Sequence, residues 1–327
     1  MIGRHSGIGM RCAVALAAAF IGAQAIAADN YPQRSIRLII PYPPGGAGDI
    51  VGRMLSARLG ERLGQQFVID NRGGGGQVIA TEMTARAAPD GYTLFLASAT
   101  HGVNPGLRDK LPYDSIRDFS PITLVASSPL VFVAHPAVGV NNIRELVALA
   151  KAKPGAISYG SSGPGTGGHL AVELLNWLAG IKLVHVPYKG AAPALIDLVG
   201  GQIQVVCTSP LPAMPHVKAG RLRALAMTGS VRSRAAPEIP TVAEAGYGAY
   251  QASLWYALLG PAKMPAPVVK RLHAEAVAVI RAQDMADQLM AQGAEPVGNT
   301  PQELETFMRG EIERWTKVIK QANIRAD

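Results

Sequence analysis

The most constraining feature of the sequence is an order of strand, glycine-rich loop and helix that occurs twice. The first copy begins with the apolar segment 35–41 (SIRLIIP), which leads to the loop 42–48 (YPPGGAG). In the second copy a strand at 156–160 leads to the loop 161–168 (SSGPGTGG) and a helix over 169–179. Nearly continuous apolar runs are typical of parallel strands buried on both faces. The pattern predicts an α/β fold with two lobes, each a mostly parallel sheet flanked by helices.

The other expected elements follow the same strand and helix periodicities. The segment after the first loop should be a helix, with Asp49 as its N-cap and Gly64 at its end. Further strands are expected at 66–70, 92–98, 182–186 and 202–208, and further helices at about 77–87, 191–199, 266–282 and 301–322.

Two apolar paths are expected to cross between the lobes. One is the long strand-like segment 121–135, and the other combines 222–228 with 251–259. The middle of the chain would then be an inserted lobe, to which the C-terminus does not belong. The expected division is residues 28–128 with 254–327 for lobe 1 and residues 129–253 for lobe 2.

The first 27 residues have the features of a secretory signal peptide. Arg4 and Arg11 give a basic start, 12–23 is apolar, and Ala25 and Ala27 are the small residues that a signal peptidase reads. The apolar run is too short to span a bilayer. Cleavage is expected near Ala27, and the mature protein is expected in the periplasm.

A lipoprotein is the alternative reading of this segment, because it contains Cys12. That cysteine follows Gly-Met-Arg and stands at the start of the apolar run, which is the wrong context for a lipid anchor. The mature chain then keeps only Cys207, so no internal disulfide is expected.

Composition and charge exclude several classes of protein. Of the 327 residues, 48% are hydrophobic and 17% charged, which favours a folded chain over a disordered one. Loss of the leader removes Arg4 and Arg11 and no acid, which lowers the net charge from +8 to +6. The remaining Lys and Arg are scattered without a basic run, so no nucleic-acid partner is expected. No later apolar segment is long enough to span a bilayer, and we expect a soluble monomer.

The two glycine-rich loops are the candidate binding sites. A helix N-terminus presents unpaired N–H groups and a partial positive charge, and glycines let a ligand approach the backbone. Gly45, Gly46 and Ala47 form one such cradle for an anion, and residues 161–167 form another. Both follow strands, at the sheet edge where open α/β sheets bind ligands. The alternative is that these glycines only make tight turns.

The loops match no nucleotide or catalytic motif. A P-loop, an H-E-x-x-H sequence and a zinc-type Cys/His cluster are all missing, so no metal or cofactor is expected. Gly160 to Gly163 narrowly misses the G-x-S-x-G hydrolase elbow. His101, His169 and His185 lie near predicted strand ends, where they could orient a ligand, support the structure or act as a base.

Five segments carry a resemblance to a known family: IIPYPPGGAGDIVGRMLSARLGERLGQQFVIDNRGGGG, APDGYTLFLAS, ISYGSSGPGTGGHLAVE, VHVPYKGAAPALIDLVGGQI and IPTVAEAGY. They resemble the Bug family, the extracytoplasmic receptors of tripartite tricarboxylate transporters. The resemblance covers nearly the whole chain from Tyr31. It implies a type II periplasmic-binding-protein fold with a hinge, no enzymatic activity, a carboxylate ligand and membrane permease partners. The ligand could be a di- or tricarboxylate, an acidic amino acid or an aromatic acid.

The resemblance also implies which residues hold the ligand, partly through ordered water. In the first loop these are Tyr42, Pro44, Gly45, Gly46, Ala47 and Asp49, and in the second Ser161, Ser162, Gly163 and Thr166. The walls would be completed by Ser98, Ala99, Thr100 and His101, and by Tyr188, Lys189 and Gly190.

The chain departs from the family pattern after the strand that follows Gly-Gly-Gln. The family often has an acid and an amide there, whereas this sequence has Thr208 and Ser209, and Thr208 is expected to contact the ligand. A ligand ammonium would lack its partner, which favours a simple aliphatic or aromatic carboxylate. Trp255 and Tyr256 could stack on a ligand ring or pack in the hinge.

Two other functions remain open at this stage. One is an exported α/β hydrolase, which would use a loop serine such as Ser162 together with a nearby base. The other is a receptor that reports ligand occupancy to a signalling partner.

Overall fold

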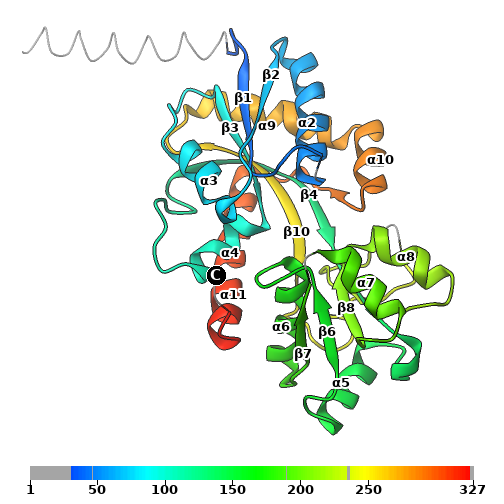
Figure 1. The fold of residues 1–327 in the computed structure, drawn as a ribbon. Helices are drawn as coiled ribbons and strands as arrows, with labels where there is room; N and C mark the ends of the chain where they lie inside the picture. Colours follow the sequence, from blue (N-terminus) through cyan, green and yellow to red (C-terminus); the bar gives the residue numbers. More distant parts are fainter. Residues whose placement is uncertain (1–30, 46, 189, 234–235, 325–327) are drawn as a thin grey trace, which may run out of the picture.

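The computed structural model describes residues 31–45, 47–188, 190–233 and 236–324. The predicted signal peptide and two predicted site residues, Gly46 and Lys189, lie outside these ranges. The described chain forms two α/β lobes, each built on its own sheet and joined by extended segments (Figure 1). The predicted two-lobed α/β fold is confirmed.

The first lobe is built on a sheet with the strand order β11-β4-β10-β3-β1-β2. β1 pairs in parallel with β2 and β3, while the returning strand β10 is inserted antiparallel between β3 and β4. The strands are β1 (Ile36–Ile40), β2 (Phe67–Asn71), β3 (Thr93–Ser98), β4 (Phe119–Pro129), β10 (Ser253–Pro261) and β11 (Glu295–Pro296). The helices that follow or cover them are α2 (Ala47–Leu63), η1 (Gly75–Gln77), α3 (Val78–Ala85), α4 (Ala99–Leu107), α9 (Ala266–Arg281), α10 (Gln283–Ala291) and α11 (Pro301–Gln321).

The second lobe is built in the same way on the order β7-β6-β8-β5-β9. β6 pairs in parallel with β7 and β8, and the entering strand β5 is antiparallel to β8 and β9. The strands are β5 (Val131–Ala134), β6 (Ser158–Ser161), β7 (Val184–Pro187), β8 (Val205–Thr208) and β9 (Arg223–Met227). The helices are η2 (Pro136–Val138), α5 (Ile143–Ala152), α6 (Gly167–Ala179), α7 (Ala191–Val199) and α8 (Pro210–Lys218).

The two crossing paths meet at Thr228, which is fully buried. β4 continues into β5 through Leu130, and the chain returns from β9 to β10 beyond Thr228. The N–H of Leu130 donates to Thr228 Oγ1 over 2.7 Å, and the N–H of Thr228 donates to the Leu130 carbonyl over 2.9 Å. The Thr228 carbonyl accepts from the N–H of Ala252 over 3.0 Å. These bonds hold the crossing segments side by side, as a hinge requires.

Four helices were not predicted from the sequence: α4, α5, α8 and α10. The sequence of α4, ATHGVNPGL, contains two glycines and Pro105, all of which are unfavourable inside a helix. α8 contains Pro215 and begins with a proline. Tertiary packing therefore overrides weak intrinsic propensity in these two helices. Asp49 is also not the predicted N-cap, because it lies in the first turn of α2.

The last helix, α11, contacts both lobes. It packs against α4 of the first lobe and against α6 of the second. Trp315, Val318 and Ile319 from its C-terminal half belong to the same apolar cluster as Leu170 of α6 and Phe132 of β5. We propose lobe boundaries near Pro129 and Ser253, as expected from the sequence, with the end of α11 shared between the lobes.

A buried carboxylate, Glu311, anchors α11 to the hinge. It is 2% exposed and accepts hydrogen bonds from Trp255 Nε1 at 2.9 Å and Trp315 Nε1 at 3.0 Å. Arg314 Nη1 also donates to Glu311, and the same atom donates to the carbonyl of Gln251 over 2.9 Å. One side chain therefore connects α11 with β10 and with the segment that returns to it.

Loss of this carboxylate should destabilise the whole fold. We expect Glu311→Ala to lower the free energy of unfolding by about 3 kcal/mol, because it leaves two buried indole N–H groups and a guanidinium without their acceptor. The matched control is Glu313→Ala on the exposed face of α11, where only an ion pair with Lys317 is lost. Chemical denaturation followed by tryptophan fluorescence measures both, and equal stability of the two variants would contradict the anchoring role.

Candidate functional site

A small cavity of about 70 Å³ lies between the lobes, and both lobes line it. Ala99 and Thr100, at the start of α4, come from the first lobe, and residues 165–167, at the start of α6, come from the second. The apolar part of the lining includes Val103, Leu130, Leu170, Leu254 and Trp315. The cavity thus combines two helix N-termini with an apolar wall.

The two helix N-termini make the cavity suitable for an anion. The first N–H groups of a helix have no carbonyl partner within the helix, and the aligned peptide dipoles add about half a positive charge. The start of α6 was expected in this role, but the start of α4 was not recognised as a helix. Ser98, a favourable residue type immediately before α4, was the available sequence signal.

In the first glycine-rich loop, the carboxylate of Asp49, a predicted ligand contact, forms its hydrogen bonds with other residues of the protein. Its carboxylate accepts from the N–H of Gly45 at 2.9 Å, from Arg53 Nε at 2.9 Å and from Asn71 Nδ2 at 2.9 Å. Burial alone would raise the pKa of Asp49, but the bonds from Arg53, Gly45 and Asn71 outweigh it and lower the pKa. Asp49 shapes the loop, and the N–H of Gly45 is used in doing so.

Tyr42 and Ser98 lie side by side behind the same loop. The Ser98 hydroxyl donates to Gln77 Oε1 over 2.7 Å and is buried. Burial raises the pKa of Tyr42, and hydrogen bonds with Ser98 and Gln77 oppose the rise. The Tyr42 ring also packs edge-on against Tyr256, with centroids 6.3 Å apart. Pro44 and Ala47, also predicted, are exposed at the loop surface.

The second glycine-rich loop is organised by its own side chains. Ser161 Oγ lies 2.6 Å from His185 Nε2 and accepts from the N–H of Gly163 at 3.1 Å. Thr166 Oγ1 donates to the Gly163 carbonyl over 2.7 Å. Gly163 has φ +127°, a backbone conformation that other residues rarely adopt. These bonds hold the loop in one shape before α6 begins.

A stack of two histidines lies beneath this loop. The rings of His169 and His185 are 4.0 Å apart and nearly parallel. The N–H of Gly165 donates to His169 Nδ1 over 2.9 Å, which requires that nitrogen to be unprotonated. Burial, and secondarily His185, lowers the pKa of His169 to about 4, and burial lowers the pKa of His185. Neutral imidazoles therefore support the loop near neutral pH.

The start of α6 packs closely on the end of β8. A Cβ at Gly168 would lie 2.2 Å from the carbonyl oxygen of Cys207, so only glycine fits there. The next residue of β8 is Thr208, which is 7% exposed and was predicted as a ligand contact. The hydroxyl of Tyr188, another predicted site residue, donates a hydrogen bond to Asp197 Oδ2 over 2.7 Å. Ser162 is exposed on the loop.

The structure places His101 and Trp255 in the core and away from the cavity. His101 is 1% exposed, its Nε2 lies 2.8 Å from the Ser115 carbonyl, and its ring contacts Phe119 edge-on. Trp255 is 1% exposed and packs on Phe307 in addition to its bond with Glu311. Neither residue is among those that line the cavity, and ligand contact by them stays a prediction. Of the residues predicted from the sequence, Ala99, Thr100, Gly165, Thr166 and Gly167 line the shared cavity.

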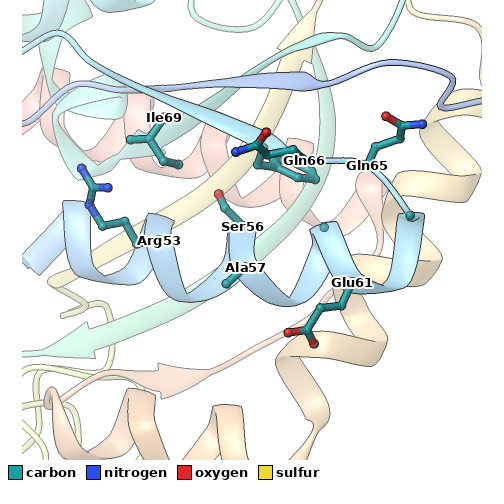
Figure 2. A pocket seen from close by; sticks show the side chains of 10 residues that line it. Arg53, Ser56, Ala57, Glu61, Gln65, Gln66 and Ile69 are labelled. Atoms are coloured by element: carbon teal, nitrogen blue, oxygen red, sulfur yellow. The ribbon is translucent and has the colours of Figure 1, made fainter.

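A separate hollow of about 570 Å³ lies on the outer surface of the first lobe, between α2 and β2. Figure 2 shows Arg53 and Ser56 on the side of α2 that faces Gln66 and Ile69, while the side chain of Glu61 points away from them. The hollow is remote from the second lobe.

Among the residues that the structure describes, no group of three or more His, Cys, Asp or Glu could hold a metal ion. Within the same ranges no helix is long and apolar enough to cross a membrane.

Comparison with known proteins identifies the family. Residues 51–324 match the model of the tripartite tricarboxylate transporter family receptor, and the chain belongs to this family. It is similar to Protein BugT of Bordetella pertussis, with 36% identity over 298 residues that cover 90% of this chain and 91% of the relative.

Two solved structures from Rhodopseudomonas palustris are also similar. Rpa4515 with adipate has a TM-score of 0.73 and 33% identity, and the match covers 90% of this chain and 99% of that one. MatC (Rpa3494) with bound malate has a TM-score of 0.69 and 30% identity, over 88% of this chain and all of that one.

The buried histidines predict a loss of stability in acid. Burial lowers the pKa of both His101 and His169 to about 4, whereas an unfolded chain titrates near 6.5. Between these values the unfolded chain binds more protons, so stability falls as the pH decreases from about 6.5 toward 4, by up to about 1.4 kcal/mol per pH unit for each histidine.

Denaturation of the wild type and of His169→Gln over this pH range measures the effect. Glutamine keeps an acceptor for the N–H of Gly165 but does not titrate. The variant should therefore show a shallower pH dependence, while carboxylates contribute equally to both proteins. Identical slopes would show that His169 is not held neutral by its surroundings.

Proposed function

We propose that the protein is a periplasmic solute-binding receptor that captures a small organic carboxylate between its lobes. The observation that carries this proposal is the cavity lined by the N-termini of α4 and α6, one from each lobe. A carboxylate there would accept hydrogen bonds from both helices, and it would draw the lobes together. Membership of the transporter receptor family supports the same function.

The proposed ligand is a simple di- or tricarboxylate or an aromatic acid. The similar proteins Rpa4515 and MatC were solved with adipate and malate. None of the described residues that line the cavity is acidic, and Thr208 and Ser209 stand at the end of β8, so a ligand ammonium has no evident partner. Val103, Leu254 and Trp315 would contact the carbon skeleton.

Ligand capture requires the lobes to move. The cavity of about 70 Å³ is far below the several hundred Å³ that enclose a small molecule in most binding proteins. We propose that the lobes rotate about the crossing segments at Thr228, and that the ligand shifts an existing equilibrium toward the closed form.

A hydrolase function is less well supported. The Ser161–His185 pair resembles a nucleophile with its base, but Ser161 is 2% exposed and its hydroxyl is engaged within the loop. The exposed Ser162 has no histidine partner in the described part of the chain. We therefore propose that the protein is not an enzyme, and turnover that is lost in Ser162→Ala would contradict this.

We further propose that the leader, with cleavage near Ala27, exports the chain to the periplasm, where it acts as a monomer. Its partner there would be the membrane permease of a tripartite tricarboxylate transporter, or a sensor protein that reads the closed form. Co-purification with the permease in the presence and absence of ligand separates transport from signalling.

Screening against a carboxylate panel tests the function directly. We expect adipate, malate or a related di- or tricarboxylate to raise the apparent stability by about 2.7 kcal/mol at a hundredfold excess over its Kd, because the ligand binds only the folded protein. Thermal unfolding with the panel measures this shift, and neutral sugars of similar size are the control. A panel that leaves the melting temperature unchanged would overturn the proposed function.

A charge placed at the start of α4 tests the site itself. Thr100→Glu should abolish carboxylate binding by repulsion, while the fold remains stable because an acid suits the first turn of a helix. Thr100→Gln is the matched neutral control, and it should bind at least about tenfold more tightly than the glutamate variant. Titration calorimetry compares the two, and equal affinities would place the carboxylate elsewhere.

A further inference from the structure

One hydrogen bond ties the second glycine-rich loop to the helix that follows it. The N–H of Gly165 donates to Nδ1 of His169, in the first turn of α6, over 2.9 Å. Burial lowers the pKa of His169 to about 4, so its imidazole is neutral near pH 7 and Nδ1 can remain the acceptor. The position of His169 therefore determines where the amide of Gly165 lies.

The ring of His169 is itself held in place by other rings. The ring of His185 stacks on it with centroids 4.0 Å apart, and the ring of Tyr159 lies 6.3 Å away, tilted by 23°. Tyr159 is fully buried, and its hydroxyl donates to Glu173 Oε1 over 2.6 Å. His185 and Tyr159 belong to β7 and β6, so the sheet of the second lobe fixes the position of Nδ1.

Gly165 lies where the two lobes meet. Cδ1 of Leu107, the last residue of α4 in the first lobe, is 3.4 Å from the position that a Cβ at Gly165 would occupy. Val103, one turn earlier in α4, belongs to the apolar cluster that contains Leu170 of α6, and Leu107 packs against this cluster. The turn at Gly165 is therefore part of the contact between α4 and the second lobe.

The same turn forms part of the wall of the cavity between the lobes. Gly165 and Gly167 both line it. A Cβ at Gly167 would lie 2.6 Å from Cδ2 of Leu254 in β10, and Gly165 has φ +71°. The backbone of the loop thus approaches the first lobe without an intervening side chain. A small shift of Gly165 would change both the shape of the cavity and the contact with Leu107.

We propose that His169 is a positioning residue for closure of the lobes. Its Nδ1 holds the amide of Gly165, and this bond keeps the turn of the loop against Leu107 of α4 when the lobes are closed. His169 is not among the residues that line the cavity, so it acts through Gly165 and not by ligand contact. This inference rests on the proposed function and adds to it the contact through which the second loop sets the affinity.

Two substitutions separate the acceptor of His169 from its ring. His169→Phe keeps an aromatic ring against His185 but has no acceptor, whereas His169→Asn loses the ring but can place its Oδ1 near the position of Nδ1. The phenylalanine variant should bind at least about fivefold more weakly than the wild type, and the asparagine variant should stay within about twofold of it. A residue that served only to fill space would give the opposite order.

Titration calorimetry near neutral pH measures these affinities with adipate, or with the acid of the panel that the wild type binds most tightly. Thermal unfolding shows that each variant is folded at the temperature of the titration. His169→Leu has nearly the shape of the asparagine variant and no acceptor. It should bind as weakly as His169→Phe, and it replaces that variant if the phenylalanine does not fit.

A double-mutant cycle tests the contact across the cleft. Leu107→Ala should weaken binding of the same acid at least about fivefold. Adding His169→Phe should then weaken it by less than about twofold more, because the contact that His169 supports is already lost. Leu149→Ala is the matched control, since Leu149 of α5 packs against the same apolar cluster from within the second lobe. This control should bind like the wild type.

The outcomes separate the inference from the function on which it rests. A phenylalanine variant as tight as the wild type, or an asparagine variant as weak as the phenylalanine one, overturns the role of His169 and leaves carboxylate capture intact. Effects of Leu107→Ala and His169→Phe that simply add also overturn it, because the two residues would then act separately. Wild-type protein that binds no acid of the panel overturns the proposed function and the inference with it.

Discussion

The hydrogen bonds to the Glu311 carboxylate are the interaction on which the arrangement of the two lobes depends. They join α11 to β10 through Trp255 and, through Arg314, to the segment that leads into β10. β10 in turn is the strand that brings the chain back from the second sheet to the first. A single buried acid therefore ties the last helix to the strand that makes the return crossing.

Buried side chains also fix the shape of the two glycine-rich loops. Asp49 uses its carboxylate to bind the N–H of Gly45, and His169 uses a ring nitrogen to bind the N–H of Gly165. In each loop one backbone N–H group therefore bonds a side chain of the protein, and this bond fixes the conformation of the loop. An amide that shapes its own loop is not free for a ligand, so a glycine-rich sequence alone does not show which amides a ligand could use.

Much of the fold could be predicted from the sequence, and less of the site. The repeated strand–loop–helix order and the two crossing paths gave the two-lobed architecture, since buried parallel strands have a clear apolar pattern. α4 was missed because Gly102, Pro105 and Gly106 hide a helix that packing against α11 stabilises. The burial of His101 and Trp255 depends on residues distant in sequence and could not be predicted from the local pattern.

α11 packs against both α4 of the first lobe and α6 of the second (Figure 1). The lobe rotation proposed above would therefore be most restricted next to α11 and widest on the side away from it. A solute would then reach the cavity from that side, where no helix joins α4 to α6 in the described part of the chain.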